Sequence, residues 1–147
     1  MAEVKIRKHI AAPPEKVFSV AIDVPSWADN IRGIEKIEML TDGPVGVGTR
    51  FRETRFIMKH EATEEMEITA LDPPRGYSIG AENHGCRFHT EVTFTPAGSG
   101  TDIEMRFEAE PLTPLAKIMS AMMKPMIAAA TQCLEQDLDD LKAHIEP

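Results

Sequence analysis

The chain has 147 residues, a formal net charge of −8 and a sequence pI of about 5.1. That length is typical of one domain with a substantial core, so we expect a single domain over residues 1–147. Its Lys and Arg residues are scattered among a larger number of acidic ones. This pattern argues against a nucleic-acid partner and against an anionic membrane surface.

The first segment alternates apolar and charged side chains and lacks the continuous apolar core of a secretory signal. This alternation predicts a strand, which Pro13 and Pro14 end. Proline is tolerated in the first turn of a helix, so a helix can begin there. A short helix with Val17 and Phe18 on its apolar side should follow, then a second one carrying Trp27 and Ile31. We therefore expect a cytoplasmic protein that begins with one strand and two short helices.

Between Ile34 and Ala109 the apolar residues alternate with a period of two, which predicts strands separated by turns rich in Gly and Pro. The expected strands are Ile34–Leu40, Thr49–Ile57, Glu61–Leu71, Tyr77–Asn83, Cys86–Thr95 and Thr101–Glu110. The apolar side chains choose the inner face of each strand, because a slip of one residue would turn them all outward. The expected inner sets are Glu64, Met66, Ile68 and Ala70; Tyr77, Ile79, Ala81 and Asn83; Cys86, Phe88, Thr90, Val92 and Phe94; and Ile103, Met105, Phe107 and Ala109.

The strand Thr49–Ile57 has two possible inner faces. One carries Phe51, Glu53, Arg55 and Ile57, and the other carries Arg50, Arg52, Thr54 and Phe56. We favour the first face, because the second buries two arginines without evident partners. A register that sets Phe51 opposite Ile68 would also set Arg55 opposite Glu64, a favourable cross-strand ion pair. The result would be a charged cluster of Glu53, Arg55 and Glu64 on an apolar wall, or else a solvated ion pair at its rim.

From Leu112 to Ile145 the apolar residues recur every three or four positions, which predicts one long C-terminal helix. Met119, Met122, Met123 and Met126 occupy two of its turns, and Pro125 in its middle predicts a kink. Methionine fills irregular gaps in a core and also suits surfaces that accept varied apolar shapes. Two interpretations stay open: ordinary core packing, or a bent helix that arches over a cavity. The lysines within this segment oppose a membrane span.

Cysteine and histidine give no sign of a metal site or another cofactor. Cys86 and Cys133 lie far apart and among apolar residues, so we expect buried free thiols. The five histidines fall mostly on outward strand positions or in turns. Nucleophile-elbow and phosphate-loop motifs are also absent from the sequence.

Several local motifs occur in a characteristic order along the whole chain. They are Ala12–Phe18, Asp23 with Trp27, Val47–Phe51, Leu71–Arg75, Phe94–Pro96 with Gly100–Thr101, and Leu138–Lys142. In this order the chain resembles the START-like superfamily, which includes the polyketide cyclase/dehydrase-like and lipid-transport (SRPBCC) proteins. The resemblance implies an α+β helix-grip fold, with a seven-stranded antiparallel sheet curved around the long C-terminal helix and a hydrophobic cavity between them.

The resemblance also implies a function. Members bind lipids, polyketides, quinones and other apolar molecules, and some catalyse cyclisation or dehydration without a common catalytic signature. We expect binding or transport of a small hydrophobic ligand; the alternative is a cyclase- or dehydratase-like enzyme with Glu53 or Glu64 as general base beside Arg55. The expected ligand-binding residues are Phe51, Met66, Tyr77, Phe88, Met105, Phe107, Met119, Met122 and Met126. The sequence leaves a homodimer open.

Overall fold

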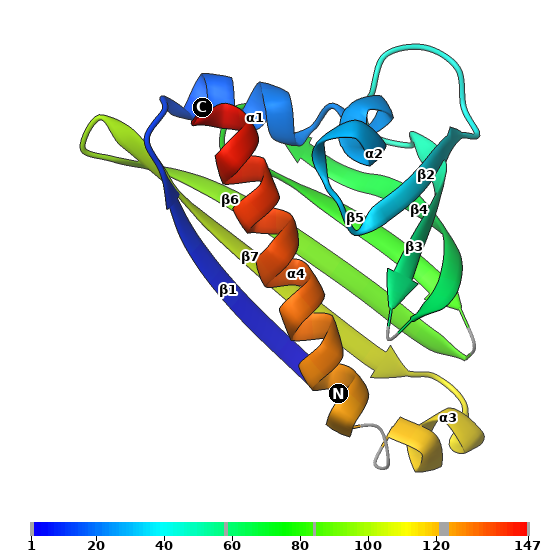
Figure 1. Ribbon diagram of the computed structural model, residues 1–147. Coiled ribbons are helices and arrows are strands. Elements are labelled where there is room, and N and C mark those ends of the chain that lie inside the picture. The colour runs from blue at the N-terminus through cyan, green and yellow to red at the C-terminus, as the bar shows by residue number, and fades with distance from the viewer. Residues whose placement is uncertain (1, 58, 84, 121–123, 147) are drawn as a thin grey trace.

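In the computed structural model, a curved antiparallel sheet wraps around a long C-terminal helix (Figure 1). The structure describes residues 2–57, 59–83, 85–120 and 124–146. Within these ranges, the side chains at positions 2, 57, 120 and 124–127 also fall outside the description.

Seven strands form the sheet in the order β1-β7-β6-β5-β4-β3-β2. Their bounds are β1 (Ala2–Ile10), β2 (Ile34–Met39), β3 (Arg50–Ile57), β4 (His60–Asp72), β5 (Gly76–Asn83), β6 (Cys86–Ala97) and β7 (Gly100–Pro111). From β2 to β7 each strand pairs with the next along the chain, and β1 closes the order by pairing with β7. The predicted seven-stranded antiparallel sheet is confirmed.

The helices cover the concave face of the sheet. They are α1 (Pro14–Ala21), the 3-10 turn η1 (Val24–Ser26), α2 (Trp27–Asn30), α3 (Pro114–Ser120) and α4 (Lys124–Ile145). Among the strands, α4 makes its main contacts with β1 and β3, which lie toward opposite sides of the sheet. It therefore bridges the concave face from one side of the sheet toward the other (Figure 1).

The prediction of one continuous helix from Leu112 with Pro125 in its middle is wrong. The described residues form two helices, and α3 lies off the axis of α4 (Figure 1). Pro125 is the second residue of α4. Backbone N–H groups in the first turn of a helix have no acceptor within the helix, so proline costs no helical hydrogen bond there. Met122 and Met123 lie outside the described residues.

The packed core lies at one end of the molecule, where α1, α2 and the C-terminal part of α4 meet the sheet. Ile10, Val17 and Phe51 are completely buried there. The ring of Trp27 meets Phe51 edge-on with centroids 5.4 Å apart, and its Nε1 donates a hydrogen bond to the Ala21 carbonyl at 2.9 Å. These contacts fix the two short helices over one end of the sheet.

The predicted inner face of β3 is correct, but its predicted register is wrong by two residues. Phe51 lies opposite Met66, and Arg55 lies opposite Ala62 rather than Glu64. The reason is the short turn, because Ile57 pairs with His60 and leaves only two residues in the connection. Two-residue hairpin turns need positive φ, and Lys59 has a φ of 67°.

A bulge in β4 corrects a second expectation. The register shifts between Ile68, which pairs with Ile79, and Ala70, which pairs with Ser78. An extra residue in one strand reverses the facing of the residues that follow it. Ala70 is consequently exposed instead of inward, and Leu71 packs against the core in its place.

Candidate functional site

A pocket of about 990 Å³ lies between the concave face of the sheet and the helices. Its lining comes from all seven strands and from α1, α2, α3 and α4, and most of it is apolar. This volume falls at the upper end of the range of roughly 300–1,000 Å³ typical of small-molecule sites. The predicted gap between sheet and helix is therefore present as an open space.

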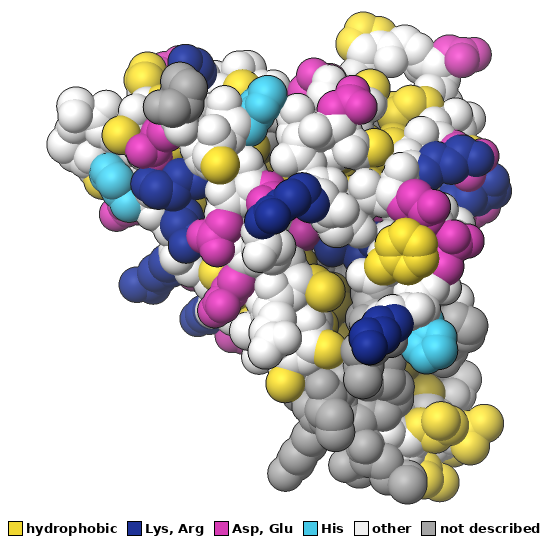
Figure 2. Space-filling model, in the orientation of Figure 1, with side chains coloured by type: hydrophobic (Ala, Val, Ile, Leu, Met, Phe, Trp, Pro, Cys, Tyr) yellow, Lys and Arg dark blue, Asp and Glu magenta, His cyan; other side chains and the backbone are white. Residues whose placement is uncertain are grey.

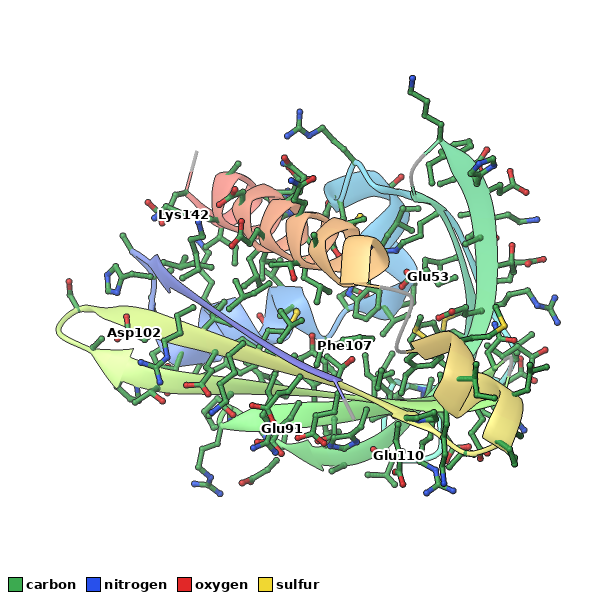
Figure 3. All side chains as sticks on the ribbon, turned by 90° about the horizontal axis from the view of Figure 1, so that it is seen from below. Glu53, Glu91, Asp102, Phe107, Glu110 and Lys142 are labelled. Carbon is green, nitrogen blue, oxygen red and sulfur yellow. The ribbon has the colours of Figure 1, made fainter. Side chains whose placement is uncertain are left out.

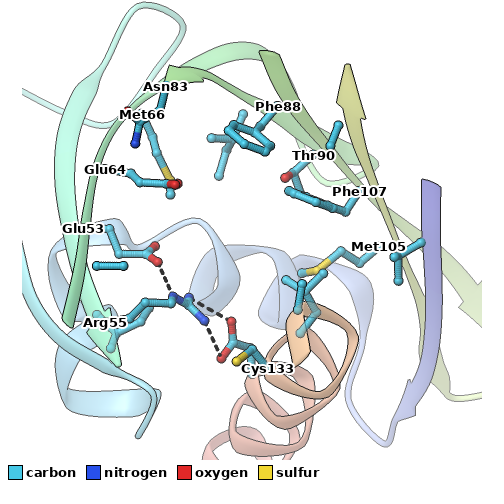
Figure 4. Close-up of a pocket in the computed structure, with 18 of the residues that line it drawn as sticks. Glu53, Arg55, Glu64, Met66, Asn83, Phe88, Thr90, Met105, Phe107 and Cys133 are labelled. Carbon is cyan, nitrogen blue, oxygen red and sulfur yellow. Dashed lines mark hydrogen bonds and ion pairs between the residues drawn. The ribbon is translucent and has the colours of Figure 1, made fainter. Parts of the chain in front are cut away.

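One wall of the pocket is aromatic and apolar. Phe88 on β6 and Phe107 on β7 stack with ring centroids 5.9 Å apart and planes 18° from parallel. Thr90 pairs directly with Phe107 across the two strands, and Met105 follows on the same face (Figure 4). Because side chains on one strand face alternate by two, the sequence pattern alone brings these residues into one surface.

The opposite wall carries three charged side chains, which we call the Arg55 cluster: Glu53, Arg55 and Asp137 (Figure 4). Arg55 Nε donates to Glu53 Oε1 at 2.5 Å. Its Nη2 donates to Asp137 Oδ2 at 3.0 Å, and its Nη1 to Asp137 Oδ1 at 3.4 Å. The three side chains are only 5%, 14% and 10% exposed, so this is a buried network.

Two elements position the cluster. Glu53 and Arg55 are two residues apart on β3 and so share the face that carries Phe51. Asp137 lies on α4 in the same stripe as Leu134, Leu138 and Leu141, which also line the pocket. The bidentate contact from Arg55 to Asp137 therefore ties the helix to the sheet across the pocket.

Burial and the charge of the nearest partners act in opposite directions on the pKa values of Arg55 and Asp137, and both values end above their usual ones. Burial alone would lower the pKa of Arg55, but Glu53 and Asp137 outweigh it and raise that pKa well above its usual value. Burial raises the pKa of Asp137 to about 6 against the lowering effect of Arg55, and Glu53 and Asp140 add to the rise. Arg55 thus stays charged while Asp137 titrates near neutral pH.

Tyr77 adds a buried hydroxyl to the pocket lining. The residue is 7% exposed and lines the pocket, and its ring lies edge-on to Phe18. Burial, and secondarily the charge of Asp137, raise its pKa above the usual value. The phenol therefore stays protonated as a potential hydrogen-bond donor.

Most of the predicted site residues come together in this pocket. The lining includes Glu53, Arg55, Glu64, Met66, Tyr77, Phe88, Met105, Phe107 and Met119. Phe51 does not line it and packs against Trp27 instead. Met122 and the side chain of Met126 lie outside the described residues. That these side chains contact a ligand stays a prediction.

Asp137 is the residue that sequence reasoning missed. The available signal was an acidic residue inside the apolar stripe formed by Leu134, Leu138 and Leu141. Cys133, one turn before it, and Cys86 are both free thiols, as predicted, but they are half-buried and line the pocket rather than the core. Among the described residues, no three His, Cys, Asp or Glu side chains gather into a metal-ligand group. None of the described helices is both long and apolar enough to cross a membrane.

Comparison with known proteins gives one family. Its model, described as "Polyketide cyclase / dehydrase and lipid transport", matches residues 1–146. No curated protein matches the sequence significantly.

Solved structures share the fold at low sequence identity. A START superfamily protein from Mycobacterium smegmatis is 16% identical with a TM-score of 0.79, covering 98% of this chain and 97% of that one. The ginseng major latex-like protein 151 from Panax ginseng is 13% identical with a TM-score of 0.76, covering 99% and 98%. The di-domain ARO/CYC StfQ from the steffimycin biosynthetic pathway is 14% identical with a TM-score of 0.80, covering 98% of this chain and 50% of that one. These likenesses establish the helix-grip fold.

Proposed function

The chain belongs to the polyketide cyclase/dehydrase and lipid transport family, and from that premise we propose that it binds and carries a small hydrophobic molecule in its pocket. The observation that supports the proposal is the open volume of about 990 Å³ with a mainly apolar lining. A well-packed core leaves few spaces larger than a water molecule, so a space of this size is available to an apolar guest. A lipid, a polyketide or a quinone-like molecule fits this description.

Native mass spectrometry of protein purified without detergent tests the proposal directly. We expect a co-purifying apolar compound, released on unfolding. After this compound is removed, Nile red, a neutral apolar dye, should bind in the pocket and its fluorescence should increase. The Ala109→Trp substitution fills the pocket from β7 and should lower dye affinity about ten-fold or more, because the indole occupies space the dye needs.

The matched control is Glu110→Trp, which places the same indole on the neighbouring residue of β7. Glu110 is exposed and points away from the helix side of the sheet (Figure 3). Dye affinity should be unchanged in this variant. Equal affinity in both variants would contradict binding in the pocket.

A second candidate function is catalysis of a cyclisation or dehydration. It is favoured by one observation: Glu53 and Glu64 both line the pocket, where a carboxylate is shielded enough to act as a general base. The two functions differ in how they respond to Glu53→Gln and Glu64→Gln. A carrier keeps its affinity for a neutral ligand within a few-fold, whereas an enzyme keeps binding and loses turnover.

A further inference from the structure

The charges that line the pocket do not balance. In the Arg55 cluster two carboxylates, those of Glu53 and Asp137, face one guanidinium, and Arg55 is the only cation among the lining residues that the structure describes. Charges in a low-dielectric space interact more strongly than charges in water. The pocket therefore presents a negative potential to whatever enters it.

Arg55 does not offset this potential for an incoming anion, because its guanidinium already serves two carboxylates. Nε is bound to Glu53, and both Nη atoms are bound to Asp137. Three of the five guanidinium N–H groups are bound to these carboxylates, whose two negative charges outnumber the single positive charge of Arg55. The only cation of the described lining is therefore a poor anchor for an anion.

Glu53, in contrast, can accept a hydrogen bond from a ligand. Its side chain is 5% exposed and lines the pocket, and its Oε1 accepts the hydrogen bond from Arg55. Its Oε2 accepts no hydrogen bond from any residue within the described part of the chain. Because this side chain lines the pocket, a ligand there can donate a hydrogen bond to the carboxylate.

The surroundings of Asp137 point the same way. Its carboxylate has a raised pKa despite two contacts from Arg55, and Glu53 and Asp140 contribute to the rise after burial. The aromatic pair Phe88 and Phe107 lies on the other wall of the pocket (Figure 4). A guest thus meets an apolar surface on one side and hydrogen-bond acceptors on the other.

We infer that the ligand is an amphiphile whose polar end donates hydrogen bonds to Glu53 and carries no negative charge. A hydroxyl or a protonated amine satisfies these conditions, and a carboxylate such as that of a fatty acid does not. This inference rests on the proposed function and narrows its ligand class.

Three probes with the same twelve-carbon chain test the inference: dodecanol, dodecylammonium and dodecanoate. Each is titrated against the protein with bound Nile red at pH 8, above the pKa of about 6 for Asp137. We expect dodecanol and dodecylammonium to displace the dye and dodecanoate to bind about ten-fold or more weakly, which corresponds to about 1.4 kcal/mol.

The variant Glu53→Gln removes one negative charge while keeping the shape of the side chain and an oxygen for Arg55. The difference in affinity between dodecanoate and dodecanol should shrink at least five-fold, because one negative charge is gone and the amide NH2 that replaces one carboxylate oxygen donates rather than accepts a hydrogen bond. Glu91→Gln is the matched control, since Glu91 pairs with Arg106 on the outer face of the sheet (Figure 3). In Glu91→Gln the difference in affinity between dodecanoate and dodecanol should be unchanged.

The outcomes are separable. Dodecanoate binding as tightly as dodecanol to the unaltered protein would overturn the inference while leaving the proposed function standing. An equal difference in affinity between dodecanoate and dodecanol in Glu53→Gln and Glu91→Gln would overturn the role of Glu53. Failure of Nile red and of all three probes to bind would contradict the proposed function itself. The measurement on the unaltered protein decides the first point even if a variant does not fold.

Discussion

The two ends of the sheet use apolar side chains in opposite ways. At the end covered by α1 and α2, Ile10, Val17 and Phe51 have no exposed surface. At the other end, Leu115, Ile118 and Met119 on α3 are 67%, 65% and 50% exposed. Figure 2 shows hydrophobic side chains gathered on the surface over α3. An apolar helical stripe therefore does not by itself identify a packed core.

The difference follows from what each helix can rest on. α1 and α2 contact the sheet and α4, so their apolar sides are enclosed from several directions. α3 has seven residues and makes its main contact with β7. Leu115 and Met119 line the pocket while remaining exposed to solvent. α3 thus forms part of the rim of the pocket.

The strongest way to break this comparison is to remove a phenylalanine at each end. Phe51→Ala should lower the free energy of unfolding by about 3–5 kcal/mol, because it leaves a cavity in a filled core. Phe107→Ala should cost only about 1–2 kcal/mol, because its ring already borders an open space. Urea unfolding measures both values. Equal losses would show that the pocket end is packed as tightly as the core.

The sequence predicted which way most strand residues face better than it predicted how the strands pair, and the reasons are physical. Alternation along the strands fixed which residues point inward, including Glu53 and Arg55, because a slip would expose a whole apolar set. Alternation does not encode the length of a turn or the position of a bulge. The register of β3 and the facing of Ala70 were therefore wrong.

The partner of Arg55 was missed for a related reason. Spacing along β3 brings Glu53 and Arg55 to one face, but nothing in one sequence tells which residue of a distant helix crosses above them. Asp137 lies 82 positions from Arg55 in the chain. The predicted helix also ran through Pro125, because the apolar period continues across the boundary between α3 and α4.

The Arg55 cluster lies between the two regions, and the pH dependence of stability probes it. Asp137 has a folded-state pKa of about 6, above its usual value of 3.8, so the folded state holds its proton more tightly than the unfolded state. Its contribution to stability is complete below about pH 3.8 and is lost as pH rises through 6. The loss is at most about 3 kcal/mol, since one pKa unit corresponds to about 1.4 kcal/mol.

The variant Asp137→Asn removes this titration. Its free energy of unfolding should therefore fall less than that of the unaltered protein between pH 4 and pH 6, as measured by urea unfolding at each pH. Asp139→Asn is the control, because Asp139 lies on the exposed side of α4 and pairs with Lys8. Identical slopes in Asp137→Asn and the unaltered protein would show that Asp137 is not held in a buried site.

The smallest expected effect is a difference in unfolding free energy between alanine variants of two turns, one at each end of the sheet. Gly85 and Gly98 both have positive φ, 75° and 63°, so alanine introduces similar backbone strain at either position. A Cβ at Gly85 would lie 2.9 Å from Thr113 Oγ1, just before α3, whereas a Cβ at Gly98 would meet no atom within 4 Å. Gly85→Ala should therefore cost about 1 kcal/mol more than Gly98→Ala in urea unfolding, by the general cost of a crowded contact.

The same pair of variants decides whether α3 belongs to the pocket. The Leu112 N–H donates to the Gly85 carbonyl at 2.7 Å, so the turn and the start of α3 are held together. Displacing Thr113 should move Leu115 and Met119, and Nile red affinity should change at least two-fold in Gly85→Ala. It should stay constant in Gly98→Ala, whose turn lies away from the lining residues. Unchanged affinity in both variants would mean that the exposed apolar surface of α3 has no part in admitting or holding the guest.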